Sequence, residues 1–245
     1  MGALRDPGRL LVAWEDAAGV PPAARGTVLL HRAGLVDDLD TALDLPIGAV
    51  ASLAARLYAE EFGAVVPGIL TCHSCGQLLD VELPMASVVA ASQDESVGAE
   101  SAVALAGGRR LLVRAPTTRD LVAAGGSHDP ARELLNRCVR AEDNAPVDAD
   151  GLDEAALTLV DAAAEELAGS AAVVVRTACP SCGTEVVAPL DVAALLWDRV
   201  AYAAPAILAE VAELAAAFGW AEAEVLALTP VRRRTYLELA RGGAR

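Results

Sequence analysis

The chain has 245 residues, of which 54% are hydrophobic and 3% are aromatic, and its formal net charge is −15. This length suffices for one large domain or two ordinary ones, and the abundance of alanine, leucine and valine favours packed helices over an aromatic-rich β-sandwich. The nineteen basic residues, all arginine, stand against 34 acidic ones. Such acidity argues against a nucleic-acid-binding protein, because phosphate contacts need clustered positive charge.

The first part of the chain has the sequence pattern of short helices. Apolar positions at helical spacing predict helices over Leu10–Ala18, Pro22–Ala33 and Ile47–Phe62. Gly63 ends the third helix, because glycine commonly follows the last residue of a helix. We therefore predict an N-terminal helical lobe over residues 1–62.

A strand–turn–strand unit follows this lobe. Short apolar runs predict strands over Ala64–Val66 and Gly68–Leu70, and alternating leucine and valine predict another strand over Gln77–Leu83. The turn between them has the sequence Cys72-His73-Ser74-Cys75-Gly76.

The same unit occurs a second time, which indicates a short internal duplication. Val173–Arg176 leads into the turn Cys179-Pro180-Ser181-Cys182-Gly183, and Thr184–Ala188 leads out of it. We assign residues 63–91 and 170–189 to the two halves of one zinc ribbon.

Residues 92–169 form a predicted inserted lobe of one strand and several helices. Thr117 begins a helix as its N-cap, with Asp120 three residues later completing a capping box in which aspartate replaces glutamate. The other predicted elements are a loop at Ser92–Gly98, a strand at Arg109–Arg114, helices at Pro130–Arg140 and Leu152–Leu167, and an acidic solvated loop at Glu142–Gly151.

Residues 190–245 form a predicted C-terminal helical lobe. A long apolar stripe begins after Asp191, and Pro205 is expected to kink this helix or divide it after Ala204. Gly219 ends the helix as a C-cap. A short helix over Ala221–Leu228 and a last helix that starts at Thr229 and Pro230 complete the chain.

Each duplicated turn carries a C-x2-C-G motif, and this motif is typical of metal binding. Two thiolates three positions apart can bind one ion from a tight turn, and four sulfurs complete the tetrahedral shell of a structural zinc site. A zinc ribbon usually separates its two motifs by about 15–20 residues, whereas 103 residues lie between Cys75 and Cys179. The predicted zinc ligands are Cys72, Cys75, Cys179 and Cys182.

Two other interpretations of these cysteines remain open. The turns could recur without binding metal, or a C-x2-C pair could be a redox centre, which requires a lowered thiol pKa and usually a helix that starts at the motif. Both motifs lie between predicted strands, which favours metal. We expect His73 to be an exposed side chain of its turn and Cys138 to be a buried, inert thiol, and we assign no chemistry to His31 or His128.

The sequence contains no recognised catalytic motif and no evident targeting segment. Nucleophile elbows, phosphate loops and paired histidines on a helix are absent, so we expect no enzymatic activity. The longest uncharged run, Phe62–Leu79, contains Pro67 and the first cysteine turn and would not span a bilayer. We expect a cytoplasmic protein without membrane contact, and in that reducing environment C-x2-C pairs more often bind metal or act in catalysis than form disulfides.

Four stretches of the chain together resemble one bacterial family. They are Gly63 with Cys72-x-x-Cys75-Gly76; Arg114-Ala115-Pro116-Thr117-Thr118-Arg119-Asp120-Leu121; Cys179-Pro180-x-Cys182-Gly183; and Phe218-Gly219-Trp220-Ala221-Glu222-Ala223-Glu224-Val225-Leu226-Ala227-Leu228-Thr229-Pro230-x-Arg232-Arg233-x-x-Tyr236-Leu237. The chain is similar over nearly its whole length to proteins encoded beside contractile-tail genes and described as T4-type baseplate hub assembly chaperones. Such proteins occur with phages and with phage-like contractile injection systems.

Two positions depart from the pattern of this family. Its members commonly have a charged Arg-Asp pair after the motif that stands here as Leu45-Pro46-Ile47-Gly48, where this chain continues with Ala49-Val50-Ala51. His73 stands where proline is usual, and this change leaves both thiolates of the turn in place.

Composition and motif spacing predict a mostly α protein with a small β component, in which a zinc ribbon of two knuckle hairpins carries an inserted lobe and flanking helical lobes. The resemblance implies a non-enzymatic assembly factor or structural accessory of a baseplate, bound to a hub or wedge protein. Aromatic and arginine side chains favour interfaces; the candidate partner-binding residues are Trp220, Arg232, Arg233 and Tyr236. Packing inside the lobe and a solvated helical face are the alternatives for these residues. A zinc-ribbon nucleic-acid-binding or transcription regulatory protein is the alternative function.

Overall fold

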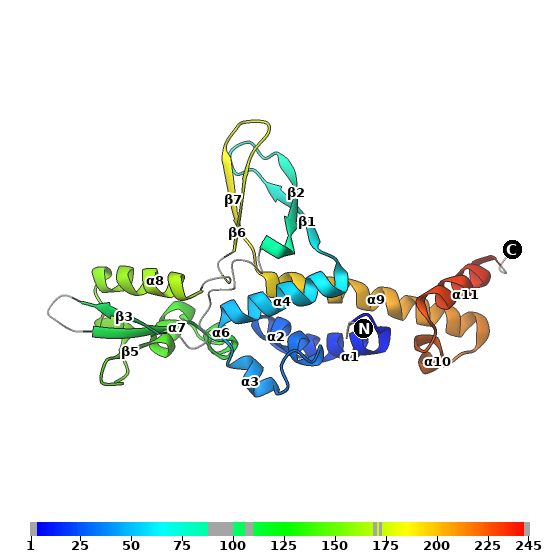
Figure 1. Cartoon of the computed structure of the whole chain (residues 1–245), viewed down its shortest axis with the longest axis horizontal. Helices are drawn as coiled ribbons and strands as arrows, with labels where there is room; N and C mark the ends of the chain where they lie inside the picture. The colour runs from blue at the N-terminus through cyan, green and yellow to red at the C-terminus, as the bar shows by residue number, and fades with distance from the viewer. Residues whose placement is uncertain (1–3, 88–99, 106–109, 169–170, 172, 243–245) are drawn as a thin grey trace.

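The computed structural model of the chain describes residues 4–87, 100–105, 110–168, 171 and 173–242, and these residues are mostly helical (Figure 1). The helices are α1 (Pro7–Ala18), α2 (Pro22–Arg32), α3 (Leu39–Leu43), α4 (Ile47–Phe62), α6 (Thr118–Gly125), α7 (Pro130–Cys138), α8 (Glu154–Ala168), α9 (Val192–Phe218), α10 (Glu222–Leu226) and α11 (Pro230–Gly242), with a 3-10 turn at Ala149–Gly151. The strands are β1 (Val65–Thr71), β2 (Leu78–Pro84), β3 (Glu100–Ala104), β4 (Arg110–Arg114), β5 (Val139–Ala141), β6 (Val174–Ala178) and β7 (Glu185–Pro189).

The molecule is elongated, with the inserted lobe at one end and α10 and α11 at the other (Figure 1). The hairpins β1–β2 and β6–β7 project together from the helical body between these ends. The mostly α fold with small sheets agrees with the fold class expected from the composition.

The central body consists of α1, α2, α4 and the first half of α9. Its core includes the fully buried side chains of Leu29, Leu30 and Leu196. Gly26 lets α2 approach α9 closely, because a Cβ atom at this position would lie 2.6 Å from the Cβ of Ala193. A leucine side chain that is fully buried contributes about 1.5–3 kcal/mol, so this core is the main source of stability in the body.

Helix α9 runs without interruption through Pro205, so of the two expected effects of this proline, a kink or a division, the division does not occur. Proline removes one backbone hydrogen bond, and packing on both sides of this residue holds the helix together. Val200 and Ala204 face the body core, whereas Val211 and Leu214 face the core of the C-terminal lobe. The helix therefore joins two separate cores. Gly219 ends it in the left-handed conformation (φ 69°), as predicted.

By length and composition alone, α9 could also cross a membrane, although it lies outside the uncharged run Phe62–Leu79. Of the most apolar 18-residue stretch of this helix, 22% is buried inside the molecule. Core helices of globular proteins meet the same two criteria, and α9 packs against α1, α2, α4, α10 and α11.

The inserted lobe is built on an antiparallel sheet of order β3–β4–β5, covered by α8. The strand predicted over Arg109–Arg114 is present from Arg110. The helix predicted to reach Arg140 ends at Cys138, and the next three residues instead pair with β4. Helix α3 and strand β3 were not predicted, and the predicted loop Ser92–Gly98 lies outside the described residues.

A buried carboxylate joins β4 to α6 in this lobe. Asp120 accepts two hydrogen bonds from the guanidinium of Arg114, at 2.6 and 3.1 Å, and two more from the backbone and hydroxyl of Thr117. The predicted capping box is present. Burial alone would raise the pKa of Asp120, but the bonds from Arg114 and Thr117 outweigh burial and hold this pKa below its usual range.

The same segment attaches the inserted lobe to the N-terminal helices. Arg119 forms ion pairs with Asp40 and Asp44 of the α3 region, at 3.1 and 2.7 Å. The buried hydroxyls of Thr118 and Thr27 form a hydrogen bond of 2.8 Å. The segment from Arg114 to Leu121, one of the four stretches that carry the family resemblance, is thus a structural joint between two lobes.

We predict that Asp120→Asn lowers the free energy of unfolding by about 2–3 kcal/mol, because it removes the charge that satisfies the guanidinium of Arg114. The lowered pKa of Asp120 means that its contribution is complete above its unfolded pKa of about 3.9 and is lost as the pH falls through the folded value. Denaturant titrations between neutral and acidic pH should therefore show a smaller acid-induced loss in the variant than in the wild type.

The control variant is Asp150→Asn, which breaks an exposed ion pair with Arg132. We expect it to change the unfolding free energy by less than about 0.5 kcal/mol. Equal losses in the two variants would contradict a special role for the buried carboxylate.

Candidate metal centre

The first hairpin places two cysteines at its tip by backbone hydrogen bonding. Strands β1 and β2 pair antiparallel, and Thr71 opposite Leu78 is the last pair before the turn. The backbone N–H of Cys72 donates to the carbonyl of Gln77 at 2.9 Å, and the N–H of Gly76 donates to the carbonyl of Cys72 at 2.9 Å. Gly76 has φ of 74°, a conformation that favours glycine.

The second hairpin repeats this geometry in β6 and β7. The N–H of Cys179 donates to the carbonyl of Thr184 at 2.9 Å, and the N–H of Gly183 donates to the carbonyl of Cys179 at 2.8 Å. Gly183 has φ of 73°. The duplication seen in the sequence is therefore a duplication of structure as well.

The tips of the two hairpins bring four sulfurs together. The Sγ atoms all lie within 4.8 Å of one another, with 3.7 Å between Cys72 and Cys182 and 3.6 Å between Cys75 and Cys179. In a regular tetrahedron with metal–sulfur bonds of about 2.3 Å, the sulfurs are about 3.8 Å apart. This four-cysteine cluster could therefore hold one metal ion, and its members are the four residues that the sequence predicted.

Apolar side chains support the cluster from inside the hairpins. Leu79 and Val186 are buried against the two buried cysteines, Cys72 and Cys179, and Leu70 packs beside them. The hydroxyl of Ser181 donates to the side-chain carbonyl of Gln77 across the hairpins at 3.3 Å. The other two cysteines are exposed, so metal can enter from the outer side.

The cluster distributes negative charge unevenly among its thiols. The hydroxyl and backbone of Thr184 lower the pKa of Cys182 to about 6. A backbone hydrogen bond from Gln77 lowers the pKa of Cys75. Hydrogen bonds with the neighbouring sulfurs of Cys182 and Cys179 outweigh this effect and raise the pKa of Cys75 to about 12. Metal ions bind thiolates, so binding to this cluster must release protons and must weaken in acid.

The remaining cysteine and the histidines lie elsewhere. Cys138 is buried beside Asp120, and burial raises the pKa of this thiol to about 11, which fits an inert side chain. His31 bonds the carbonyl of Val36, and His73 and His128 are exposed. In the described chain, neither C-x2-C motif starts a helix, which is unlike a redox pair.

The candidate partner-binding residues lie in the C-terminal lobe. Trp220 and Tyr236 are half-buried and contact each other edge to face, with ring centroids 4.8 Å apart, and Trp220 also stacks on Phe218. Arg233 pairs with Glu210 of α9 at 2.8 Å. Arg232 is exposed. Trp220, Tyr236 and Arg233 therefore contribute to the packing of the C-terminal lobe. Partner binding by these residues or by Arg232 stays a prediction.

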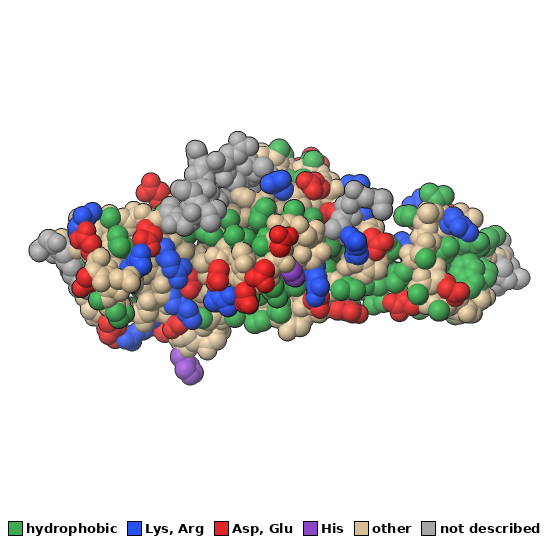
Figure 2. Space-filling model, turned by 60° about the horizontal axis from the view of Figure 1, so that its bottom comes forward, with side chains coloured by type: hydrophobic (Ala, Val, Ile, Leu, Met, Phe, Trp, Pro, Cys, Tyr) green, Lys and Arg blue, Asp and Glu red, His purple; other side chains and the backbone are tan. Residues whose placement is uncertain are grey.

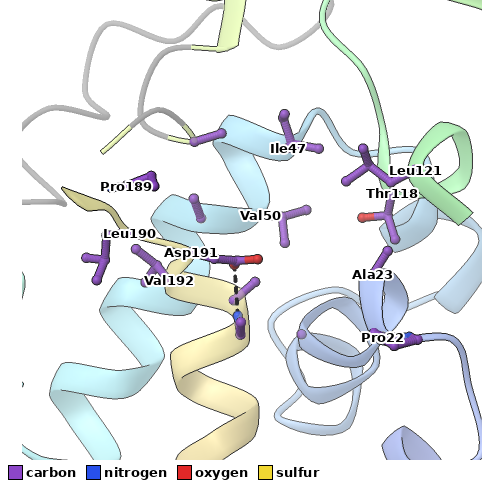
Figure 3. Close-up of a pocket in the computed structure, with 15 residues that line it drawn as sticks. Pro22, Ala23, Ile47, Val50, Thr118, Leu121, Pro189, Leu190, Asp191 and Val192 are labelled. Atoms are coloured by element: carbon purple, nitrogen blue, oxygen red, sulfur yellow. Dashed lines mark hydrogen bonds between the residues drawn. The ribbon is translucent and has the colours of Figure 1, made fainter. Parts of the chain in front are cut away.

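A small apolar pocket lies where α2, α4, α6 and the start of α9 meet (Figure 3). Its volume is about 290 Å³. Thr118 and Asp191 add polar groups to its walls, but Thr118 bonds Thr27, and Asp191 accepts the N–H of Ala194 as the N-cap of α9. Because both groups have partners inside the chain, we assign the pocket no ligand. Its apolar lining includes Pro22, Ala23, Ile47, Val50, Leu121 and Val192.

Comparisons of this chain with protein-family models, with curated proteins and with solved structures find no match. The chemistry of the four-cysteine cluster therefore rests on its own geometry.

We predict one bound metal ion per chain, coordinated by four sulfurs. Elemental analysis of protein purified without added chelator should give one equivalent, and X-ray absorption at the metal edge should fit four sulfur neighbours at about 2.3 Å. Nitrogen or oxygen neighbours, or two ions per chain, would contradict a single four-sulfur site.

Loss of one ligand should destabilise the hairpins. Cys179→Ser removes a buried sulfur from the cluster, and because metal binding contributes to folding we expect a loss of roughly 3 kcal/mol or more. The matched control is Cys138→Ser, which alters a buried thiol outside the cluster and should cost less than about 1.5 kcal/mol.

Thermal melts with and without a chelator test this prediction. The chelator should lower the melting temperature of the wild type and of Cys138→Ser while changing Cys179→Ser little, and equal losses in the two variants would refute it.

Proposed function

We propose that the four-cysteine cluster binds structural zinc and that the two hairpins form a zinc ribbon. Tetrahedral four-sulfur sites hold zinc or iron, and zinc prefers a closed shell of this kind where its role is structural. Four protein ligands leave no coordination position for water or substrate. The elemental analysis described above separates zinc from iron.

Zinc in this site would connect two segments that are distant in the sequence. The loop between Cys75 and Cys179 contains 103 residues. Closing a loop of this length costs conformational entropy, and the free energy of metal binding would offset that cost. A two-stranded hairpin alone is marginally stable in water. The metal would thus stabilise both hairpins and fix the position of the inserted lobe between them.

We propose that the protein is a non-enzymatic assembly factor or structural accessory of a contractile tail or injection-system baseplate, acting through protein–protein contacts. The observation that carries the proposal is the closing segment from Phe218 to Leu237, the most specific part of the family resemblance. This segment packs on the end of α9, where its Val225 and Leu237 share a core with Val211 and Leu214 of that helix. Hydrophobic side chains gather over this end of the molecule (Figure 2).

Contact with protein, and not with nucleic acid, fits the charges on the hairpins. Their outward strand positions carry the acidic side chains of Asp80, Glu82 and Glu185, and one basic side chain, Arg176, among the described residues. A zinc ribbon that binds nucleic acid needs a basic face. The acidic hairpins therefore support the baseplate proposal over the alternative.

The test is capture of tail proteins from a host that encodes a contractile particle. The wild-type chain should capture a hub or wedge protein, identified by mass spectrometry. Trp220→Ala should reduce capture by about tenfold or more if the closing segment forms the interface. The matched control is Trp197→Ala, which removes the half-buried tryptophan that packs under Arg25 in the central body.

Both tryptophan variants must fold, as judged by circular dichroism and metal content. Equal capture by the two variants would remove the closing segment from the interface. Capture of no tail protein by the wild type would contradict the baseplate proposal itself.

A further inference from the structure

The outward face of α11 is an apolar stripe flanked by arginines. Val231 and Leu239 are 74% and 58% exposed. Arg232 and Arg234 lie on either side of this stripe, exposed, and neither has an ion pair or ring contact among the described residues. Glu238 is the single acidic residue of the helix. On a chain with so many carboxylates, these two exposed arginines flank Arg233, which is paired with Glu210, yet have no acidic partner of their own among the described residues.

Helix stability does not explain the sign of these charges. Arg232 lies in the first turn of α11, which has no acidic residue, and Arg234 directly follows that turn. The N-terminus of a helix carries partial positive charge, so cations near it are unfavourable. An anionic partner from outside the helix would reverse this cost.

Helix α8 carries charges of the opposite sign near its C-terminus. It contains four acidic residues and no basic one, and Glu165 and Glu166 lie in its last turn, where the dipole disfavours anions. Neither glutamate has an ion pair among the described residues. Between the acidic side chains, the outward face of α8 exposes Ala155, Leu159 (46% exposed) and Ala162.

These two faces cannot meet within one chain. Helix α8 belongs to the inserted lobe at one end of the long axis, and α11 lies at the opposite end (Figure 1). A contact between them would therefore join two molecules, and a second copy of this chain supplies both the apolar stripe and the charges of opposite sign.

We propose that the α11 face of one copy docks antiparallel on the α8 face of a second copy. In this arrangement the first turn of α11 lies beside the last turn of α8, so that Arg232 and Arg234 face Glu165 and Glu166. The apolar stripes pack between the charged rows, as in helix pairs with flanking ion pairs. The unfavourable terminal charges of both helices then neutralise one another, and the opposed helix dipoles add a favourable contribution.

This contact joins two different surfaces, so it is heterologous and produces a ring or an open chain of copies. One helix face from each partner is a small interface, typical of transient complexes. Its charges are exposed to solvent, so the association must weaken as salt is added. The proposal does not depend on the baseplate function, since it concerns copies of one chain.

The experiment measures the mass of the metal-loaded chain in solution. Sedimentation equilibrium at low salt should show the weight-average mass rising above the monomer mass of 25.1 kDa as protein concentration increases. The double variant Arg232→Glu, Arg234→Glu and the double variant Glu165→Arg, Glu166→Arg should each stay monomeric. Both substitutions favour their helix dipole, so the variants should fold.

The variant with all four substitutions is the decisive one. It restores opposite charges across the contact and keeps the net charge of the wild type, so it should associate again. The control Asp80→Arg, Glu82→Arg changes two exposed residues on the first hairpin by the same charge and should associate like the wild type. Association should also weaken at least tenfold between about 0.05 and about 0.5 M NaCl.

Three results would overturn the proposal. One is a wild-type chain that stays at monomer mass up to millimolar concentration. Another is self-association that either double variant leaves unchanged, or that the fourfold variant fails to restore. The third is a wild-type chain that binds duplex DNA through Arg232 and Arg234 while it remains monomeric.

Discussion

The convergence of four cysteine sulfurs is the constraint on which the rest of this molecule depends. Two turns that are far apart in the sequence must end within a few ångströms of each other, which aligns the hairpins side by side. At their bases, the N–H of Met85 bonds the carbonyl of Ala64, and the N–H of Leu190 bonds the carbonyl of Val173. Side chains near these bases pack on the body core. The hairpins are thus held at both ends.

A second constraint comes from the carboxylate of Asp120. A buried charge is costly unless every oxygen is bonded, and here the bonds come from the end of β4 and the start of α6. The strand, the turn and the helix must therefore keep one relative geometry. Arg119, one residue earlier, points to α3 instead. Asp120 thus holds the inserted lobe together, and the adjacent Arg119 attaches this lobe to the N-terminal helices.

Local signals in the sequence were sufficient to predict the four clustered cysteines and most helix ends. The C-x2-C-G turn, the capping box at Thr117 and the C-cap at Gly219 each depend on residues a few positions apart. Two elements that the sequence did not predict, β5 and α3, depend on partners that are distant in the chain. Val139–Ala141 has no strand pattern of its own and becomes a strand by pairing with β4. The five residues of α3 are too few to show helical periodicity, and its ion pairs with Arg119 span more than seventy positions.

The unbroken course of α9 has a mechanical consequence. A helix of 27 residues is about 40 Å long, and this one begins directly after the second hairpin and ends at the C-terminal lobe. Its first half is buried in the body core and its second half carries the C-terminal lobe, so the lobe lies at the end of a rod that is anchored in the body. A rotation of the body by about 10° about the start of α9 would carry the lobe through about 7 Å, by the length of the rod alone.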